Sequence, residues 1–316
     1  MSAMPSVRAS IGTLAVLGLA DVKMAETPTT AYLLLYSPSG CSAGCAYCLQ
    51  SSKLSRSSGG EKLGRITWLP VDLETIKRSW KRVFTRICLQ TVIKPKFADE
   101  TLKILEAIRS FEPELPFSLA TTPVPRVYLE EARELGVDSL GVGLDAATQL
   151  LFEEWSKPYS WDLYWRFIGE AVEVFGKGNV YIHLIAGLGE SLRELAYAMK
   201  RIYGLGGRVA LFNYTDVKGV SPVDISYYRL AQLARYLLEH GLDPDIYIDY
   251  ERRMVKREVP LNSTVEAFYT SGCPSCNRPF YTESPHGPLY NIPSRRLLEA
   301  YYKKLREELR GIGVSL

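Results

Sequence analysis

The sequence lacks any long apolar run. The apolar stretch from Leu14 to Ala20 is too short to span a bilayer. It also lacks a basic start and a small-residue cleavage site, which are the marks of a secretory signal peptide. We therefore expect a cytoplasmic protein with no membrane partner.

The chain also has almost no net charge. Its 38 basic residues outnumber its 35 acidic residues by three, so composition demands no polyanionic partner. The densest basic run, residues 252–257, is more typical of a solvated face than of a nucleic-acid patch. No basic platform rich in aromatic residues accompanies it, and we expect no DNA or RNA partner.

Cysteine is sparse and clustered. The 316 residues contain six cysteines, and none of them precedes position 41. A disulfide framework is typical of small secreted domains, and this chain is large and shows no signal sequence. The clusters therefore indicate metal binding or catalysis. The six are Cys41, Cys45, Cys48, Cys88, Cys273 and Cys276.

Eight short β-rich runs alternate with helical patterns along the chain. Several are almost continuously apolar, as in parallel strands that are buried on both faces. This alternation favours an α/β fold and predicts a (β/α)8 TIM-type barrel, either complete or partial. The expected strands are 32–36, 86–92, 117–121, 139–144, 179–186, 208–214, 245–250 and 264–270. The expected helices are 72–85, 99–110, 126–135, 160–175, 191–203, 223–240 and 294–310.

The same pattern divides the chain into three parts. Residues 1–30 are expected to form an N-terminal arm or helix, residues 31–293 the barrel, and residues 294–316 a C-terminal helix. A Ser/Gly-rich stretch over residues 51–64 predicts a mobile loop over the active face.

The first cysteine group comprises Cys41, Cys45 and Cys48 and has the spacing C-x3-C-x2-C. It follows the first expected strand, at the end of the barrel where active sites lie. Three thiolates on one short loop can hold three corners of a 4Fe–4S cluster and leave the fourth iron open. A structural zinc site is the alternative, although zinc knuckles usually pair cysteines as C-x2-C.

This motif, with Tyr47 before the last cysteine, resembles that of the radical S-adenosylmethionine (SAM) superfamily. The resemblance implies that SAM chelates the open iron and that the reduced cluster cleaves it to a 5′-deoxyadenosyl radical. It also places Tyr47 near the adenine.

The resemblance extends to other strand ends. It implies that Asp145 binds the ribose hydroxyls, as a matching Asp does in the related biotin synthases, although Asp145 also suits a helix N-cap. The segment with Gly187, Gly189 and Glu190 is similar to the glycine-rich segment that backs the cofactor. Three further residues at strand ends, Gln90, Thr91 and Thr121, fall where family members bind the methionine part of SAM.

The second cysteine group comprises Cys88, Cys273 and Cys276. The C-x2-C pair closes easily on one metal, and Cys88 lies on a strand close to it in a closed barrel. The group therefore predicts an auxiliary iron–sulfur cluster, with Ser294, His286 or Arg278 as candidates for a fourth ligand. Otherwise Cys88 is a buried small apolar residue and the pair binds zinc or forms a redox pair.

A SAM radical beside a second cluster indicates sulfur insertion, as in biotin and lipoyl synthases. The chain departs from biotin synthases, since Leu119, Ala120 and His183 stand on strands where those enzymes add cysteines. It also lacks the extra N-terminal cysteines of the usual bacterial lipoyl synthases. It most resembles the two-component lipoyl synthases found mainly in archaea, in motifs spread over most of the chain. These include residues 7–13, residues 30–33, Cys88 and the Cys273/Cys276 pair with Asn277-Arg278-Pro279.

That resemblance implies a sulfurtransferase that acts on an octanoylated lipoyl-carrier protein. Its implied partners are a second lipoyl synthase component and a ferredoxin-like electron donor. A biotin synthase-like reaction, another radical SAM reaction such as methylation or rearrangement, and a non-enzymatic zinc protein are the competing interpretations. The sequence decides neither which of the two carbons receives sulfur nor the oligomeric state.

Overall fold

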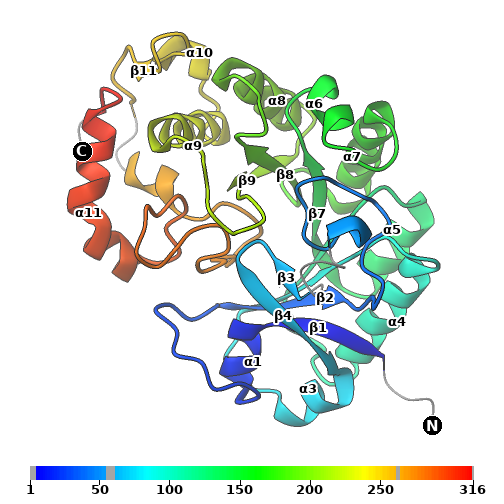
Figure 1. The fold of residues 1–316 in the computed structure, drawn as a ribbon. Coiled ribbons are helices and arrows are strands. Elements are labelled where there is room, and N and C mark those ends of the chain that lie inside the picture. Colours follow the sequence, from blue (N-terminus) through cyan, green and yellow to red (C-terminus); the bar gives the residue numbers. More distant parts are fainter. Residues whose placement is uncertain (1–4, 55–60, 261–263, 315–316) are drawn as a thin grey trace.

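A curled sheet of nine strands forms the centre of the molecule in a computed structural model that describes residues 5–54, 61–260 and 264–314 (Figure 1). The strand order is β3-β4-β1-β2-β5-β6-β7-β8-β9. From β2 to β9 neighbouring strands pair in parallel, and β1, β4 and β3 extend the sheet in antiparallel fashion. The parallel strands are β2 (Thr30–Leu35), β5 (Arg86–Gln90), β6 (Phe117–Thr121), β7 (Val137–Asp145), β8 (Val180–Ala186) and β9 (Arg208–Asn213).

Helices cover the outer face of the sheet. Leu, Ile and Val side chains of the parallel strands are buried against these helices. Several helices have a polar N-cap residue whose side chain binds the first turn; Ser191, for example, forms a capping box with Glu194 at the start of α8. The helices are α1 (Ile11–Leu17), α3 (Leu73–Ser79), α4 (Phe97–Arg109), α5 (Arg126–Glu134), α6 (Gln149–Glu154), α7 (Trp161–Phe175), α8 (Leu192–Gly204), α9 (Ile225–Glu239), α10 (Pro244–Tyr247) and α11 (Arg295–Arg310).

The predicted α/β barrel is confirmed as a half-barrel with six parallel strands. The strand expected at 245–250 is wrong, because Asp243 caps a short helix that begins at Pro244. Only β10 (Ile248–Asp249) follows it, and β10 pairs with β11 (Met254–Val255) outside the main sheet. The strand expected at 264–270 is also wrong; it is the 3-10 helix η1 (Thr264–Phe268). A short apolar run does not distinguish a strand from a helical turn by periodicity.

The N-terminal segment does more than was expected of an arm. It contains the helix α1, and β1 (Ser6–Ser10) also lies in the sheet between β2 and β4 (Ile66–Asp72). Of the loop expected at 51–64, residues 55–60 lie outside the described part. Lys62–Leu63 forms β3, which pairs with β4. The division into arm, barrel and C-terminal helix stays an interpretation, as does the mobility of the loop.

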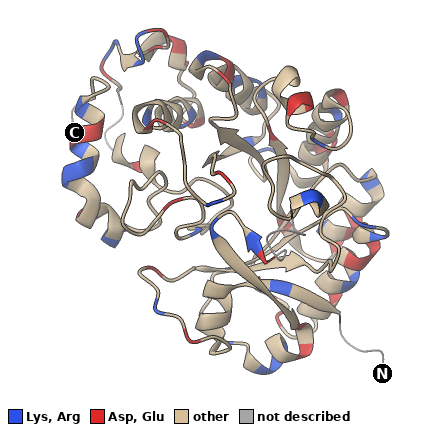
Figure 2. Ribbon diagram, in the orientation of Figure 1, with Lys and Arg blue, Asp and Glu red and all other residues tan. Residues whose placement is uncertain are grey.

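Charged residues of both signs are interspersed on the outer helices (Figure 2). Within the described residues, no helix is both long enough and apolar enough to cross a membrane. The parallel strands all run the same way, so their carboxyl ends meet on one side of the half-barrel and their amino ends on the other.

Candidate active site in the half-barrel

A cavity of about 540 Å³ lies inside the curled sheet, and all six cysteines line it. That volume falls in the range of small-molecule sites. The cavity brings together most of the residues predicted from the sequence. Besides the cysteines, its lining includes Tyr47, Gln90, Thr91, Thr121 and Asp145.

The first cysteine group lies on the loop that follows the carboxyl end of β2. Backbone hydrogen bonds fix this loop: the Cys41 amide donates to the Gln50 carbonyl at 2.6 Å, and the Ser52 amide donates to the Cys41 carbonyl at 2.8 Å. The Ile93 amide donates to the Cys41 sulfur at 3.2 Å. An amide aimed at sulfur favours a thiolate, and hydrogen bonds of this kind accompany iron–sulfur ligation.

Burial makes two of these thiols, Cys45 and Cys48, weaker acids. It raises the pKa of Cys45, and it raises the pKa of Cys48 to about 12. Binding to iron would release the protons, because the thiolate is the ligand form. Three soft sulfur donors on one fixed loop, facing a cavity with room for a cofactor, suit an iron–sulfur cluster. These residues therefore could hold one.

A buried charge network lies beside this loop. The carboxylate of Asp145, at the end of β7, accepts a hydrogen bond from the Tyr47 hydroxyl and forms an ion pair of 2.5 Å with the Lys157 ammonium. Both donors engage the same oxygen, Oδ2. Lys157 also donates to the Gly143 carbonyl at 2.7 Å, and its side chain is only 5% exposed.

The network keeps Lys157 charged. Burial lowers the pKa of Lys157, but the Asp145 carboxylate outweighs burial, and the pKa lies well above its usual value. Asp145 itself has a φ of 67°, in the left-handed region that non-glycine residues rarely adopt. The strand irregularity between Val142 and Asp145 accompanies this turn. The backbone thus turns the carboxylate toward Tyr47 and leaves its Oδ1 for another donor.

The remaining predicted cofactor residues fall into two sets. Gln90, Thr91 and Thr121 line the cavity at neighbouring strand ends, where the two threonine hydroxyls lie 3.2 Å apart. The segment 187–190 does not line the cavity. Its Glu190 carboxylate instead accepts the amides of Gly187 and Leu188, at 2.6 and 3.0 Å, and closes its own turn.

Packing explains the glycine at position 187 without a ligand. Gly187 has a φ of 98°, and a Cβ there would lie 2.4 Å from Val223 Cγ2. The Glu190 carboxylate also accepts the Tyr227 hydroxyl at 2.6 Å. Gly189, with a φ of 127°, lies on the same turn. The assignment of this segment to the cofactor stays a prediction.

The second cysteine group lies further back along the same strands: Cys88 is the middle residue of β5, and the loop with Cys273 and Cys276 is bound to Thr30 at the start of β2. Cys88 is in β5, opposite Tyr32 of β2 and Ser118 of β6. Cys276 Sγ lies 3.4 Å from the Tyr32 hydroxyl oxygen, and the Ser118 side chain acts to lower the pKa of Cys273. The first group therefore lies beyond the carboxyl end of β2, and the second lies between the middle and the amino ends of the strands.

The three cysteines of the second group are half-buried. Burial raises the pKa of Cys88 well above its usual value, and the pKa of Cys273 to about 12, with further increases from the neighbouring cysteines. Arg86 and Arg278 act in the opposite direction on both thiols. All three cysteines line the same cavity. Among the described residues, no three Cys, His, Asp or Glu side chains are arranged around the position of a single metal ion.

The three candidates for a further ligand are in different places. Arg278 lines the cavity with the second group, and its guanidinium stacks 3.8 Å from the centre of the Phe212 ring. His286 is exposed and does not line the cavity. Ser294 caps α11 and donates to Glu26. Of the three, only Arg278 faces the second group.

Sequence analysis missed Lys157 and gave His183 no role. Lys157 lies in an irregular loop after α6, so no periodic pattern marks it. His183 lines the cavity from β8, and burial lowers its pKa to about 4, so it is neutral at pH 7. Gly141 on the neighbouring strand makes room for it, because a Cβ there would lie 2.9 Å from its Nε2.

A buried carboxyl group lies behind the cavity wall. Burial raises the pKa of Glu283 to about 7. The Thr282 hydroxyl oxygen lies 2.6 Å from both Glu283 Oε2 and Asn213 Oδ1, yet a hydroxyl carries one proton. A protonated Glu283 that donates to Thr282, which in turn donates to Asn213, satisfies all three groups.

Comparison with known proteins agrees with this geometry. The family model described as the radical SAM superfamily matches residues 35–202. The crystal structure of methylornithine synthase (PylB) is similar at a TM-score of 0.51 and 14% identity, over 67% of this chain and 63% of that chain. That of HydG, a maturase of the FeFe-hydrogenase, is similar at a TM-score of 0.51 and 12% identity, over 67% and 50%.

The similarity covers only part of each solved structure. The chain spans between one half and two thirds of the length of these two solved structures. No curated protein matches it in sequence. At these identities the solved structures show a common fold.

Proposed function

We propose that this chain, which belongs to the radical SAM superfamily, is a sulfur-insertion enzyme with a second iron–sulfur cluster. Membership in the family implies a 4Fe–4S cluster and SAM. One observation carries the proposal beyond the family: two groups of three cysteines line a single cavity, one beyond the carboxyl end of β2 and one between the middle and the amino ends of the parallel strands.

The first cysteine group would hold the SAM-cleaving cluster. When bound, the cluster and SAM supply a radical that removes hydrogen from an unactivated carbon. Tyr47 and Lys157 both bind Oδ2 of the Asp145 carboxylate, and its Oδ1 would accept a ribose hydroxyl. Gln90, Thr91 and Thr121 offer amide and hydroxyl groups along the same wall.

The second cysteine group would hold the cluster that gives up sulfide. Arg278 is the side chain best placed as its further ligand, because it shares the cavity wall with Cys273 and Cys276. The middle of the cavity, where Gly141 and His183 lie, would receive the carbon chain between the two groups. His183 is neutral there, so it adds no charge to the path of an apolar substrate.

The substrate we propose is an octanoyl chain on the lysine of a lipoyl-carrier protein, with this chain as one component of a two-protein lipoyl synthase. A second component and a ferredoxin-like electron donor belong to this proposal. Its support is the set of sequence motifs together with the two cysteine groups. Biotin synthase-like sulfur insertion would use the same arrangement with a different carbon substrate.

The test is anaerobic turnover of an octanoyl-lysyl peptide with SAM, a reductant and the partner protein. Mass spectrometry should show a product heavier by sulfur, together with 5′-deoxyadenosine. Cys273→Ala should abolish the sulfur product and preserve 5′-deoxyadenosine formation, whereas Cys41→Ala should abolish both. Formation of the sulfur product by the Cys273→Ala variant would refute the role of the second group.

A further inference from the structure

The loop that carries Cys273 and Cys276 has no regular secondary structure, yet it is tied at several points to the amino ends of the barrel strands. The Ser275 carbonyl accepts the hydroxyls of Thr29 and Thr30, at 2.5 and 3.3 Å. The Asn277 side chain accepts the Thr29 amide and donates to the Thr27 carbonyl. These contacts fix the side of the loop that faces away from the cavity.

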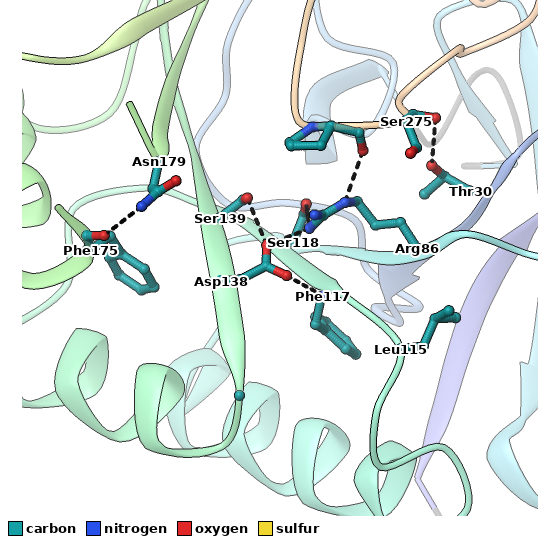
Figure 3. A network of polar contacts seen from close by, with 12 residues as sticks. Thr30, Arg86, Leu115, Phe117, Ser118, Asp138, Ser139, Phe175, Asn179 and Ser275 are labelled. Carbon is teal, nitrogen blue, oxygen red and sulfur yellow. Dashed lines mark hydrogen bonds and ion pairs between the residues drawn. The ribbon is translucent and has the colours of Figure 1, made fainter. Parts of the chain in front are cut away.

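Arg86, the first residue of β5, is the most connected of these anchors (Figure 3). Its Nε donates to the Pro274 carbonyl at 2.9 Å. Its Nη1 donates to the Ser118 hydroxyl at 3.0 Å and forms an ion pair of 2.5 Å with Asp138. Its side chain is only 6% exposed. One guanidinium thus joins the cysteine loop to the neighbouring strands β6 and β7.

The contact with Ser118 has a directional consequence. A hydroxyl has one proton and can accept on its oxygen. Because Arg86 donates to that oxygen, the Ser118 proton is left for another acceptor. Ser118 lies beside Cys273 and acts to lower the pKa of that thiol, so the Cys273 sulfur is the acceptor we infer.

Asp138 binds the same guanidinium. Its Oδ1 accepts from Arg86 and from the Ser139 hydroxyl at 2.7 Å, and its Oδ2 accepts the Phe117 amide at 3.2 Å (Figure 3). The carboxylate is thereby fixed to the start of β6. With Asp138 fixed, the guanidinium contacts the Pro274 carbonyl and the Ser118 hydroxyl together.

We propose that Arg86 is a positioning residue for the second cysteine group: it orients the Ser118 hydroxyl toward Cys273 and anchors the loop through Pro274, and so governs how tightly that group holds an iron–sulfur cluster. This inference rests on the proposed second cluster. Groups outside the ligand shell commonly change metal affinity by about 10- to 100-fold. Hydrogen bonds to cluster sulfurs also raise reduction potential.

The experiment compares wild type with Arg86→Met and Ser118→Ala, purified without oxygen and reconstituted. Arg126→Met is the matched control, because Arg126 forms ion pairs with Glu130 and Glu173 on the outer helices, away from the cavity. Three quantities are measured: iron and sulfide per chain, the rate of iron loss to a chelator, and the midpoint potential of the second cluster.

Arg86→Met should lose iron from the second cluster about tenfold faster than wild type, and Arg126→Met should match wild type. Ser118→Ala, which removes one hydroxyl and keeps the anchor at Pro274, should retain its iron but show a lower midpoint potential for the second cluster. If Arg86→Met fails to fold, Ser118→Ala still tests the proposal. SAM cleavage at the first cysteine group should persist in Ser118→Ala, and in Arg86→Met if that variant folds.

The outcomes separate this inference from the proposed function. A wild-type protein without a second cluster refutes both. A wild-type protein with two clusters, together with unchanged iron loss in Arg86→Met or an unchanged potential in Ser118→Ala, refutes the positioning role alone and leaves the second cluster intact.

Discussion

Replacing Lys157 with Met tests the charge network beside the first cysteine group. Methionine retains most of the apolar stem but removes the ammonium that contacts Asp145 and the Gly143 carbonyl. The Asp145 carboxylate, 15% exposed, then keeps Tyr47 as its donor and loses its counter-charge. Breaking a buried ion pair from one side costs about 3–5 kcal/mol.

We expect a loss near the lower end of that range, about 3 kcal/mol, because Tyr47 and partial exposure still stabilise the carboxylate. Whole-domain stabilities of about 5–15 kcal/mol leave the variant folded. The raised pKa of Lys157 means that its contribution is fully present below its unfolded pKa and is lost only as the pH rises through the folded value. The loss should therefore be the same at pH 7 and pH 9.

The assay is denaturant unfolding of the metal-free protein. Lys200→Met is the control, since Lys200 pairs with Asp243 and Asp245, whose side chains are about half exposed. That pair should contribute about 0–1 kcal/mol. The double variant Asp145→Asn/Lys157→Met should lose less stability than the sum of its single variants.

The single variant Lys157→Met should also bind SAM at least about tenfold more weakly, because the Asp145 carboxylate without its second donor is free to turn away from the site. A free energy of unfolding that changes no more in Lys157→Met than in Lys200→Met would refute the buried-pair reasoning. Unchanged SAM affinity would refute the role of the pair in orienting Asp145.

Three further predictions concern single positions. Gly187→Ala should destabilise the protein by about 1–3 kcal/mol in denaturant unfolding, because its Cβ would overlap Val223; an unchanged midpoint would contradict this. A raised carboxyl pKa makes the free energy of unfolding of wild type fall by about 3 kcal/mol as the pH rises from 4.5 to 7. Glu283→Gln should abolish this fall, because glutamine does not titrate. Parallel pH profiles of wild type and variant would exclude a protonated Glu283. Gly141→Ala should displace His183 and lower the rate of product formation with little change in SAM affinity, and equal losses in both would place its effect elsewhere.

Local patterns in the sequence predicted much of the fold. The six parallel strands and the helices between them have apolar runs and caps that determine them locally, as Ser160 and Ser191 do for α7 and α8. The missing seventh and eighth strands have a common cause. The two runs have only six and seven residues, too few for a reliable period, and they form a helix that begins at Pro244 and the 3-10 helix η1 instead.

The site divides in the same way. Spacing along one loop brings Cys41, Cys45 and Cys48 together, so sequence alone sufficed to group them. Cys88 and the 273–276 loop come together because the sheet is curved. The expected order of the strands was enough to predict that they lie on the same side of the barrel. Lys157 could not be predicted, because a loop after α6 delivers it to Asp145 and no pattern links the two positions.

The central claim is that two iron–sulfur clusters share one cavity, and the most direct test is an anaerobic count of iron and acid-labile sulfide per chain. Wild type should carry about eight iron if both clusters are cubanes, and the Cys273→Ala/Cys276→Ala variant about four. The Cys41→Ala/Cys45→Ala/Cys48→Ala variant should also carry about four, held by the second group. About four iron in wild type and in the Cys273/Cys276 variant alike would contradict the claim and leave a radical SAM enzyme that has one cluster and a different reaction.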